Sequence, residues 1–171
     1  QDQTFFPPKV WNVITGRIER DFTCHQGTVL SCAISSDATK FSSTSADKTA
    51  KIWSFDLLSP LHELKGHNGC VRCSAFSLDG ILLATGDDNG EIRIWNVSDG
   101  QLLHSCAPIS VEEGTATHGG WVTDVCFSPD SKTLVSAGGY LKWWNVATGD
   151  SSQTFYTNGT NLKKIHVSPD F

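Results

Sequence analysis

Residues 66–96 read GHNGCVRCSAFSLDGILLATGDDNGEIRIWN, a stretch that begins with a Gly-His pair and ends on a tryptophan that closes an apolar strand. Between these markers, short apolar runs alternate with turns rich in Gly, Asn and Asp, which is typical of strands joined by hairpins. No segment has a convincing helical period. The pattern predicts a four-stranded antiparallel sheet with strands over residues 71–77, 81–86, 91–96 and 101–106.

Three markers from this stretch recur along the chain with a period of about 42 residues. A tryptophan followed by Asn or Ser closes an apolar strand at Trp11, Trp53, Trp95 and Trp144. A histidine precedes three of these tryptophans by about 26–28 residues, at His25, His67 and His118. A Ser-x-Asp turn begins at Ser35, Ser77, Ser128 and Ser168. Three independent markers with one period predict an array of structural repeats.

The spacing and the markers resemble those of WD40 repeats, in which a Gly-His pair and a Trp-Asp pair bound each unit. The resemblance implies an all-β fold, a β-propeller fragment in which every repeat is one four-stranded blade. The aspartate of the Trp-Asp pair is replaced throughout by Asn or Ser. We expect three complete blades over 23–64, 65–106 and 107–156, the last with a longer loop, partial blades over 9–22 and 157–171, and an atypical junction over 1–8.

Such a chain is an open arc, whereas WD40 rings usually close with about seven blades. An open arc exposes blade faces and strand edges, which favours pairing or aggregation. We therefore expect the isolated chain to fold poorly by itself.

The WD40 resemblance also implies a hydrogen-bonded set of four side chains, a tetrad, inside each blade. A buried indole N–H or imidazole without a partner costs about 1–3 kcal/mol, so these groups must be paired. The first blade matches with His25, Ser43, Asp47 and Trp53. The second has His67, Thr85 and Trp95, with Asn89 at the position of the acid, and the third has His118, Ser136 and Trp144 with no acid. We expect the second and third blades to be held less tightly, and we interpret the histidines as structural.

Composition narrows the classes of partner and site. The net charge of −5 disfavours nucleic acid, which rewards basic surfaces, and Lys163-Lys164 is a solvated pair rather than a basic patch. No apolar run approaches the roughly 18–20 residues of a membrane helix, and no signal peptide is recognisable. We expect a cytoplasmic chain whose six cysteines are reduced. Cys70 and Cys73 form a CxxC pair without a second ligand pair, so we expect strand packing and no metal site.

Three stretches, residues 66–76, 86–96 and 117–124, together with the tail 154–171, resemble the C-terminal propeller of the apoptosome-forming, caspase-activating ATPases. The resemblance implies that propellers hold a nucleotide-binding module inactive by intramolecular contact. Cytochrome c then docks on the propellers, and relief of this autoinhibition leads to caspase activation. ATP or dATP would bind only to domains outside this sequence, so we expect no cofactor here.

Loop positions on one rim of a propeller suggest where a partner binds. The loop before a first strand and the loop between second and third strands share that rim. Trp121 lies in the first kind of loop, where an aromatic is a candidate interface anchor because the sister repeats carry small residues, Thr28, Cys70 and Asn161. Asp87 and Asp88 lie in the second kind, where Asn89-Gly90 already supplies the turn. By the resemblance, Asp87, Asp88 and Trp121 contact the basic cytochrome c.

Other functions fit parts of the pattern. A generic WD40 scaffold or substrate receptor would share the fold and use the same rim. An enzyme is disfavoured because each histidine recurs at a structural register and no separate Ser-His-Asp set or carboxylate pair stands apart from the repeat. The ligand is implied by resemblance alone, since a fold does not by itself specify function.

Overall fold

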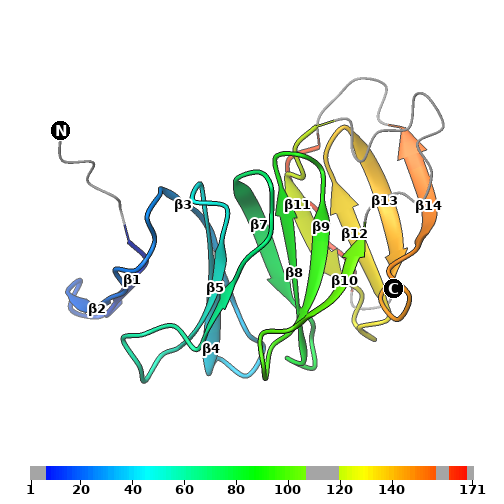
Figure 1. Cartoon of the computed structure of the whole chain (residues 1–171). Helices are drawn as coiled ribbons and strands as arrows, with labels where there is room; N and C mark the ends of the chain where they lie inside the picture. Colours follow the sequence, from blue (N-terminus) through cyan, green and yellow to red (C-terminus); the bar gives the residue numbers. More distant parts are fainter. Residues whose placement is uncertain (1–6, 107–119, 157–161, 169–171) are drawn as a thin grey trace.

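The computed structural model describes residues 7–106, 120–156 and 162–168, and every regular element in these ranges is a β-strand. Three four-stranded antiparallel sheets stand side by side, with a two-stranded hairpin at one end (Figure 1). None of the described segments is a helix with the length and apolar character needed to cross a bilayer. The all-β propeller-fragment architecture expected from the repeat is confirmed.

Each sheet, or blade, follows the chain order of its strands. The hairpin consists of β1 (Lys9–Trp11) and β2 (Ile18–Asp21). The first blade contains β3 (Val29–Ile34), β4 (Lys40–Ser45), β5 (Ala50–Ser54) and β6 (His62–Leu64). The second contains β7 (Val71–Phe76), β8 (Leu82–Asp87), β9 (Ile92–Asn96) and β10 (Leu102–Cys106). The third contains β11 (Asp124–Phe127), β12 (Thr133–Ala137), β13 (Tyr140–Asn145) and β14 (Ser151–Tyr156).

The Ser-x-Asp marker is the turn between the first and second strands of each blade. In each case the serine hydroxyl donates to the aspartate two residues later, and a residue in the left-handed region follows that aspartate. The three bonds are Ser35 to Asp37 at 2.6 Å, Ser77 to Asp79 at 2.5 Å and Ser128 to Asp130 at 2.6 Å. Hydrogen bonds from Ser35 and Thr39 lower the pKa of Asp37 to about 2.

The Trp-Asn marker lies at the end of the third strand of a blade, where β9 and β13 end. Asn96 Oδ1 accepts a hydrogen bond from the Ser98 N–H at 2.8 Å, and Asn145 Oδ1 accepts one from the Ala147 N–H at 2.9 Å. An asparagine side chain caps such a turn as an aspartate does, because both offer a carbonyl oxygen to the backbone two residues on. The turn is therefore preserved when asparagine replaces the aspartate of the Trp-Asp pair.

Apolar side chains are buried in layers between neighbouring blades. One layer joins the first and second blades through Ala50, Ile52, Leu64, Val71, Leu83 and Trp95. Another joins the second and third through Ile92, Ile94, Val122, Val125, Leu134 and Trp144. The blades approach closely at Gly86, where an added Cβ would lie 2.5 Å from a methyl carbon of Val122. Each blade is thus completed by the face of the next.

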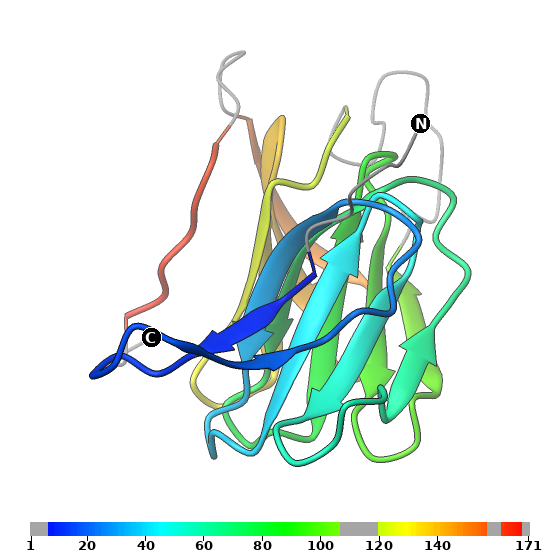
Figure 2. The same cartoon turned by 90° about the vertical axis from the view of Figure 1, so that its left-hand side faces the viewer.

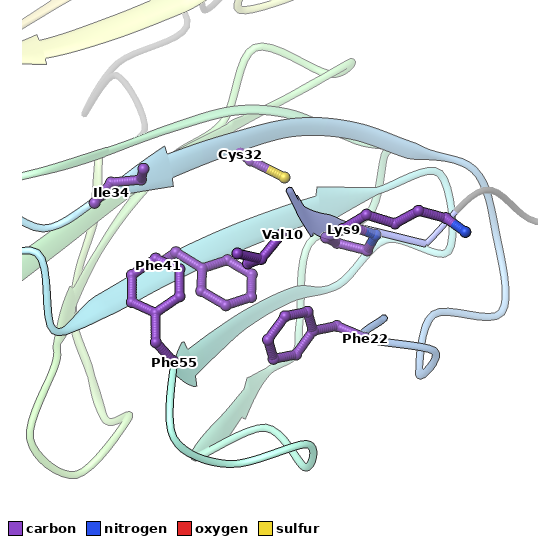
Figure 3. A pocket seen from close by; sticks show the side chains of 8 residues that line it. Lys9, Val10, Phe22, Cys32, Ile34, Phe41 and Phe55 are labelled. Carbon is purple, nitrogen blue, oxygen red and sulfur yellow. The ribbon is translucent and has the colours of Figure 1, made fainter. Parts of the chain in front are cut away.

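The two ends of the arc leave apolar side chains exposed. The hairpin lies across one face of the first blade (Figure 2) and packs Phe22 against Phe41 and Trp53. It covers that face incompletely, because a cavity of about 150 Å³ remains between Val10, Ile34 and Phe55 (Figure 3). At the other end, β14 is exposed along its whole length.

The segment after the third blade departs from expectation. A partial blade was expected over residues 157–171, but the described residues 162–168 form no strand. The segment is held mainly by side chains of the third blade: the Ile165 N–H donates to the buried Asp124 carboxylate at 2.8 Å. A strand requires a paired ladder, and the part of the chain that the structure describes offers none on the outer side of this segment. Residues 1–6, 107–119, 157–161 and 169–171 lie outside the described residues.

We predict that the isolated 171-residue chain associates or unfolds without a sharp transition, because apolar faces at both ends of the arc meet water. Sedimentation velocity together with calorimetry of the purified chain would measure this. A monomer with one cooperative unfolding transition would contradict the prediction.

Candidate functional site

A relay of hydrogen bonds links the four tetrad side chains of the first blade. The Trp53 indole N–H donates to Ser43 Oγ at 2.8 Å, and the Ser43 hydroxyl lies 2.7 Å from His25 Nε2. His25 Nδ1 lies 2.8 Å from an Asp47 carboxylate oxygen. An indole can only donate and a carboxylate can only accept. His25 donates from Nδ1 to Asp47, and because burial lowers the pKa of His25 and favours the neutral ring, its Nε2 accepts from the Ser43 hydroxyl.

The second blade has the same relay with a different acid. The Trp95 N–H donates to Thr85 Oγ1 at 2.9 Å, and Thr85 lies 2.7 Å from His67 Nε2. His67 Nδ1 lies 3.1 Å from the carboxylate of Asp87. The expectation that Asn89 stands in the place of the tetrad acid is therefore wrong. The expectation that the second blade is held less tightly rested on a missing acid, and Asp87 supplies that acid.

Asp87 occupies the tetrad because its carboxylate reaches the same point from two residues earlier in the chain. Its Oδ1 accepts the N–H groups of Asn89 and Glu91, each at 2.9 Å, and its Oδ2 accepts the N–H of Gly69 at 3.2 Å. Asp47 binds the backbone of its own turn and of the Gln26 loop in the same way. Asp87 is fully buried, so the expectation that it is an exposed rim acid is also wrong.

The third blade shows part of a relay. The Trp144 indole N–H donates to Ser136 Oγ at 2.7 Å, and both side chains are buried. His118, the predicted third member, lies outside the described residues. The prediction that no acid completes this blade therefore stays untested.

Burial and hydrogen bonds set the charge states in the first two relays. Burial lowers the pKa of His25 below 6.5, with the Asp47 carboxylate opposing the shift. Burial opposes ionisation of Asp47, but bonds from Thr49 and His25 outweigh it and keep the pKa of Asp47 below 3.8. Burial likewise opposes ionisation of Asp87, and bonds from His67 and the Glu91 backbone keep the pKa of Asp87 below 3.8. A neutral imidazole next to an ionised carboxylate follows in the first blade.

The order Ser43–His25–Asp47 matches that of a hydrolase triad, but the arrangement lacks a usable nucleophile. Ser43 is fully buried, and its oxygen already accepts the indole N–H of Trp53. A nucleophilic hydroxyl must face a space in which a substrate carbonyl fits, beside donors for the developing oxyanion. The chemistry of the relay is therefore structural.

The nearest approach to a metal-ligand cluster among the described residues is the group His67, Asp87 and Glu91, whose ligand atoms lie within 4.8 Å of one another. Both ring nitrogens of His67 are hydrogen-bonded in the tetrad. One Glu91 oxygen accepts from Arg93 and Ser105. The cluster extends the tetrad, and a metal would have to displace these bonds.

The CxxC pair does not converge on one point. Cys73 is buried, with its sulfur 3.8 Å from the carbonyl oxygen of Val122, whereas Cys70 is half-buried at the loop. Burial and a hydrogen bond to Asp88 raise the pKa of the Cys70 thiol. The two residues act separately, Cys73 between blades and Cys70 beside the rim.

Two kinds of loop meet on one rim of the arc, as expected. The Ala46 N–H donates to the Thr28 carbonyl at 2.9 Å in the first blade, and the Asp88 N–H donates to the Cys70 carbonyl at 3.0 Å in the second. The Val122 N–H of the third blade donates to the Asp87 carbonyl at 3.0 Å. This last bond places the loop that carries Trp121 against the end of β8.

Arg72 joins Trp121 to Asp88 at this rim, and we call these three residues the rim cluster. The Arg72 guanidinium carbon lies 3.8 Å from the centroid of the Trp121 ring, and Arg72 Nε donates to Asp88. Trp121 is 56% exposed, while the Asp88 side chain is 22% exposed. The candidate surface is therefore a large exposed aromatic beside a compensated ion pair, and it differs from the open acidic pair expected from Asp87 and Asp88.

Arg72 was not identified from the sequence. It stands five residues after His67, where the sister repeats carry Leu30 and Thr123. A charged residue at a register position otherwise filled by Leu or Thr was a signal that it faces the rim.

Comparisons with known proteins give a consistent result. The family profile described as "WD domain, G-beta repeat" matches residues 16–54, 58–96 and 111–145. The chain is similar to apoptotic protease-activating factor 1 of Rattus norvegicus, with 94% identity over 95% of this chain, and to that of Homo sapiens, with 85% identity over the same share. The protein of the same name from Danio rerio is 54% identical. The chain spans 13% of the length of each of these relatives.

We predict that Asp87→Ala destabilises the second blade by about 1–3 kcal/mol for each buried donor left unpaired, those of His67 and Gly69. Hydrogen-exchange mass spectrometry of residues 82–96 in a full-length protein that contains this segment would measure the loss. Asp99→Ala, in an exposed turn, is the control and should change stability by about 0.5 kcal/mol or less. Equal effects of the two changes would contradict the role of Asp87.

We predict that the first blade loses stability as the pH falls. Because the pKa of His25 is lower in the folded state, the unfolded chain takes up that proton first, so stability declines as the pH drops below 6.5 through the folded pKa. Protonation of Asp47 lowers the stability of this blade further below pH 3.8. Hydrogen exchange of residues 40–54, corrected for intrinsic rates, would show this, and His25→Gln should flatten the slope between about pH 7 and about pH 5. An unaltered slope in that variant would contradict the assignment.

Proposed function

Because the chain belongs to the WD40-repeat family and closely matches proteins named for protease activation in apoptosis, we propose that it forms part of a propeller whose loop rim binds cytochrome c. The binding surface is the rim cluster of Arg72, Asp88 and Trp121 together with the loops around it. The activity is recognition of a protein, with no catalytic step in this segment.

The single observation that carries the proposal is the exposure of Trp121. A tryptophan that is 56% exposed sits on a rim where loops from two blades meet, and its backbone is fixed by the bond from Val122 to the end of β8. Tryptophan is enriched among residues that dominate binding energy when they become buried in an interface. A rigidly placed, exposed aromatic is therefore the natural anchor of this surface.

Charge supports a basic ligand. The chain carries a net charge of −5, and Asp88 is a rim carboxylate. Lysine residues of cytochrome c would be attracted over a Debye length of about 8 Å at physiological ionic strength. Steering of this kind raises the association rate, whereas burial of the aromatic slows dissociation.

The relatives' names give protease activation in apoptosis, and the resemblance of the sequence to the propellers of caspase-activating ATPases suggests the consequence that we propose. Binding of cytochrome c to the propeller relieves an intramolecular contact with a nucleotide-binding module elsewhere in the protein, and caspase activation follows. ATP or dATP belongs to that module, and this segment binds none. A site of action in the cytoplasm is part of the same proposal.

A generic WD40 scaffold with another protein ligand is the alternative, since it would present the same rim. The two candidates differ in their ligand. A direct titration with purified cytochrome c separates them.

We expect Trp121→Ala to raise the rate of cytochrome c dissociation by about thirtyfold or more, as for a hot-spot aromatic. Asp88→Lys should lower the association rate by about tenfold at low salt, with a smaller effect as salt is added. Surface plasmon resonance with a full-length protein that contains this segment would measure both rates.

Matched controls come from the same chain. Trp11→Ala removes a tryptophan that is 55% exposed on the hairpin, and Asp56→Lys reverses an exposed acid in the β5–β6 turn, on the opposite rim. Neither should alter binding. Unchanged rates for both Trp121→Ala and Asp88→Lys would remove the rim cluster from the interface and leave the generic scaffold.

A further inference from the structure

Arg72 is the one residue of the rim cluster that touches both of the others. It lies on β7, Asp88 follows β8 of the same blade, and Trp121 comes from the loop before β11 of the next blade. The guanidinium carbon sits 3.8 Å from the ring centroid of Trp121. Its Nε donates to one oxygen of Asp88. One side chain therefore couples the orientation of an aromatic on one blade to a carboxylate on another.

The stack covers part of the indole and leaves the rest exposed. Trp121 keeps 56% of its surface accessible, and the Arg72 side chain keeps 30%. A planar guanidinium over an aromatic ring is held by the ring quadrupole and by contact between the two flat surfaces. This restricts the indole before any ligand arrives, and a restricted side chain loses less entropy on binding.

The ion pair between Arg72 and Asp88 weakens the attraction of a cationic ligand to the rim. Arg72 and Asp88 are partly buried, and together they carry no net charge. A cationic ligand that approaches the rim therefore meets a carboxylate that is already compensated. Asp88 attracts a ligand lysine fully only when Arg72 moves off it.

We propose that Arg72 is a positioning residue: it holds Trp121 in its binding orientation and exchanges places on Asp88 with a lysine of the bound protein. This inference rests on the proposed function and deepens it. The ligand lysine takes the Asp88 carboxylate, while the guanidinium stays on the indole, which the ligand covers from its open side. The surface that this arrangement fits is an apolar patch with a lysine at its edge.

The proposal has a signature that a merely structural arginine would lack. Arg72→Gln removes the stack and the competing cation together, so dissociation and association should both become faster. We expect dissociation to rise by about three- to tenfold from loss of the stack. We expect association at low salt to rise by about two- to fivefold, with a steeper salt dependence, because Asp88 is uncompensated.

Arg72→Lys separates the two effects, because lysine keeps the charge but lacks the planar group. It should raise the dissociation rate and leave the association rate unchanged. Arg17→Gln, which removes an exposed arginine from the β1–β2 turn, is the matched control and should change neither rate. Rates would be measured with cytochrome c and a full-length protein that contains this segment.

A second readout needs no ligand. The fluorescence of Trp121 is obtained as the difference between the protein and its Trp121→Phe variant, each with and without Arg72→Gln. Acrylamide is a neutral quencher, so the change of charge does not itself alter its collisions with the indole. Arg72→Gln should increase quenching of the Trp121 component, whereas Arg17→Gln should not.

The outcomes are distinct. Increased quenching together with faster association and dissociation supports the proposal. Unchanged quenching shows that Arg72 does not hold Trp121, and unchanged or slower association shows that Asp88 is not released, so either result overturns it. If cytochrome c fails to bind the unaltered protein, the proposed function fails, and with it the exchange on Asp88, while the quenching result still decides whether Arg72 positions Trp121.

Discussion

A buried indole N–H that must be paired is the constraint on which the rest of this structure depends. In the first two blades the indole is satisfied by a hydroxyl, the hydroxyl by an imidazole and the imidazole by a carboxylate. Each member uses the proton or lone pair that its neighbour needs, so loss of one leaves at least one buried group unpaired. The relay ties the loop before the first strand to the second and third strands. It therefore fixes the strand order of a blade and the position of its rim.

The same relay positions the proposed binding surface. The Asp87 carboxylate holds the loop at Gly69 and the turn at Glu91, and the Asp87 carbonyl accepts the N–H of Val122 from the next blade. Trp121 is the residue before Val122 and is carried into place by that bond. An exposed aromatic thus stands on backbone that a buried tetrad and a layer of apolar side chains immobilise. Placing recognition residues on loops fixed by a rigid scaffold is how such surfaces keep their shape without covering the residues themselves.

The charge that the rim presents depends on whether each carboxylate is exposed and unpaired, and not on the number of acids in the sequence. Two adjacent aspartates in the sequence suggest an open negative patch, but one of them belongs to the interior and the other is paired with Arg72. An ion pair that water still reaches contributes little to stability by itself. The role that we propose for it at this rim is to orient an aromatic and to set how strongly a carboxylate attracts a cation.

The repeat markers predicted the all-β architecture and the Ser-x-Asp turns without any coordinates, because His25, Trp53 and the Ser35 turn recur at the spacing of WD40 repeats and short apolar strands lie between them. The resemblance to WD40 repeats also implied the first-blade tetrad, and the position of Trp121 in a rim loop indicated a candidate interface anchor. Only the tertiary structure decided which acid completes the second tetrad, since Asp87 and Asn89 both lie within reach of His67 along the chain and burial selects between them. It also decided that Arg72 joins Trp121 to Asp88. That contact crosses two blades, and the distance between residues on neighbouring sheets is set by how the sheets pack, which a one-dimensional period does not encode.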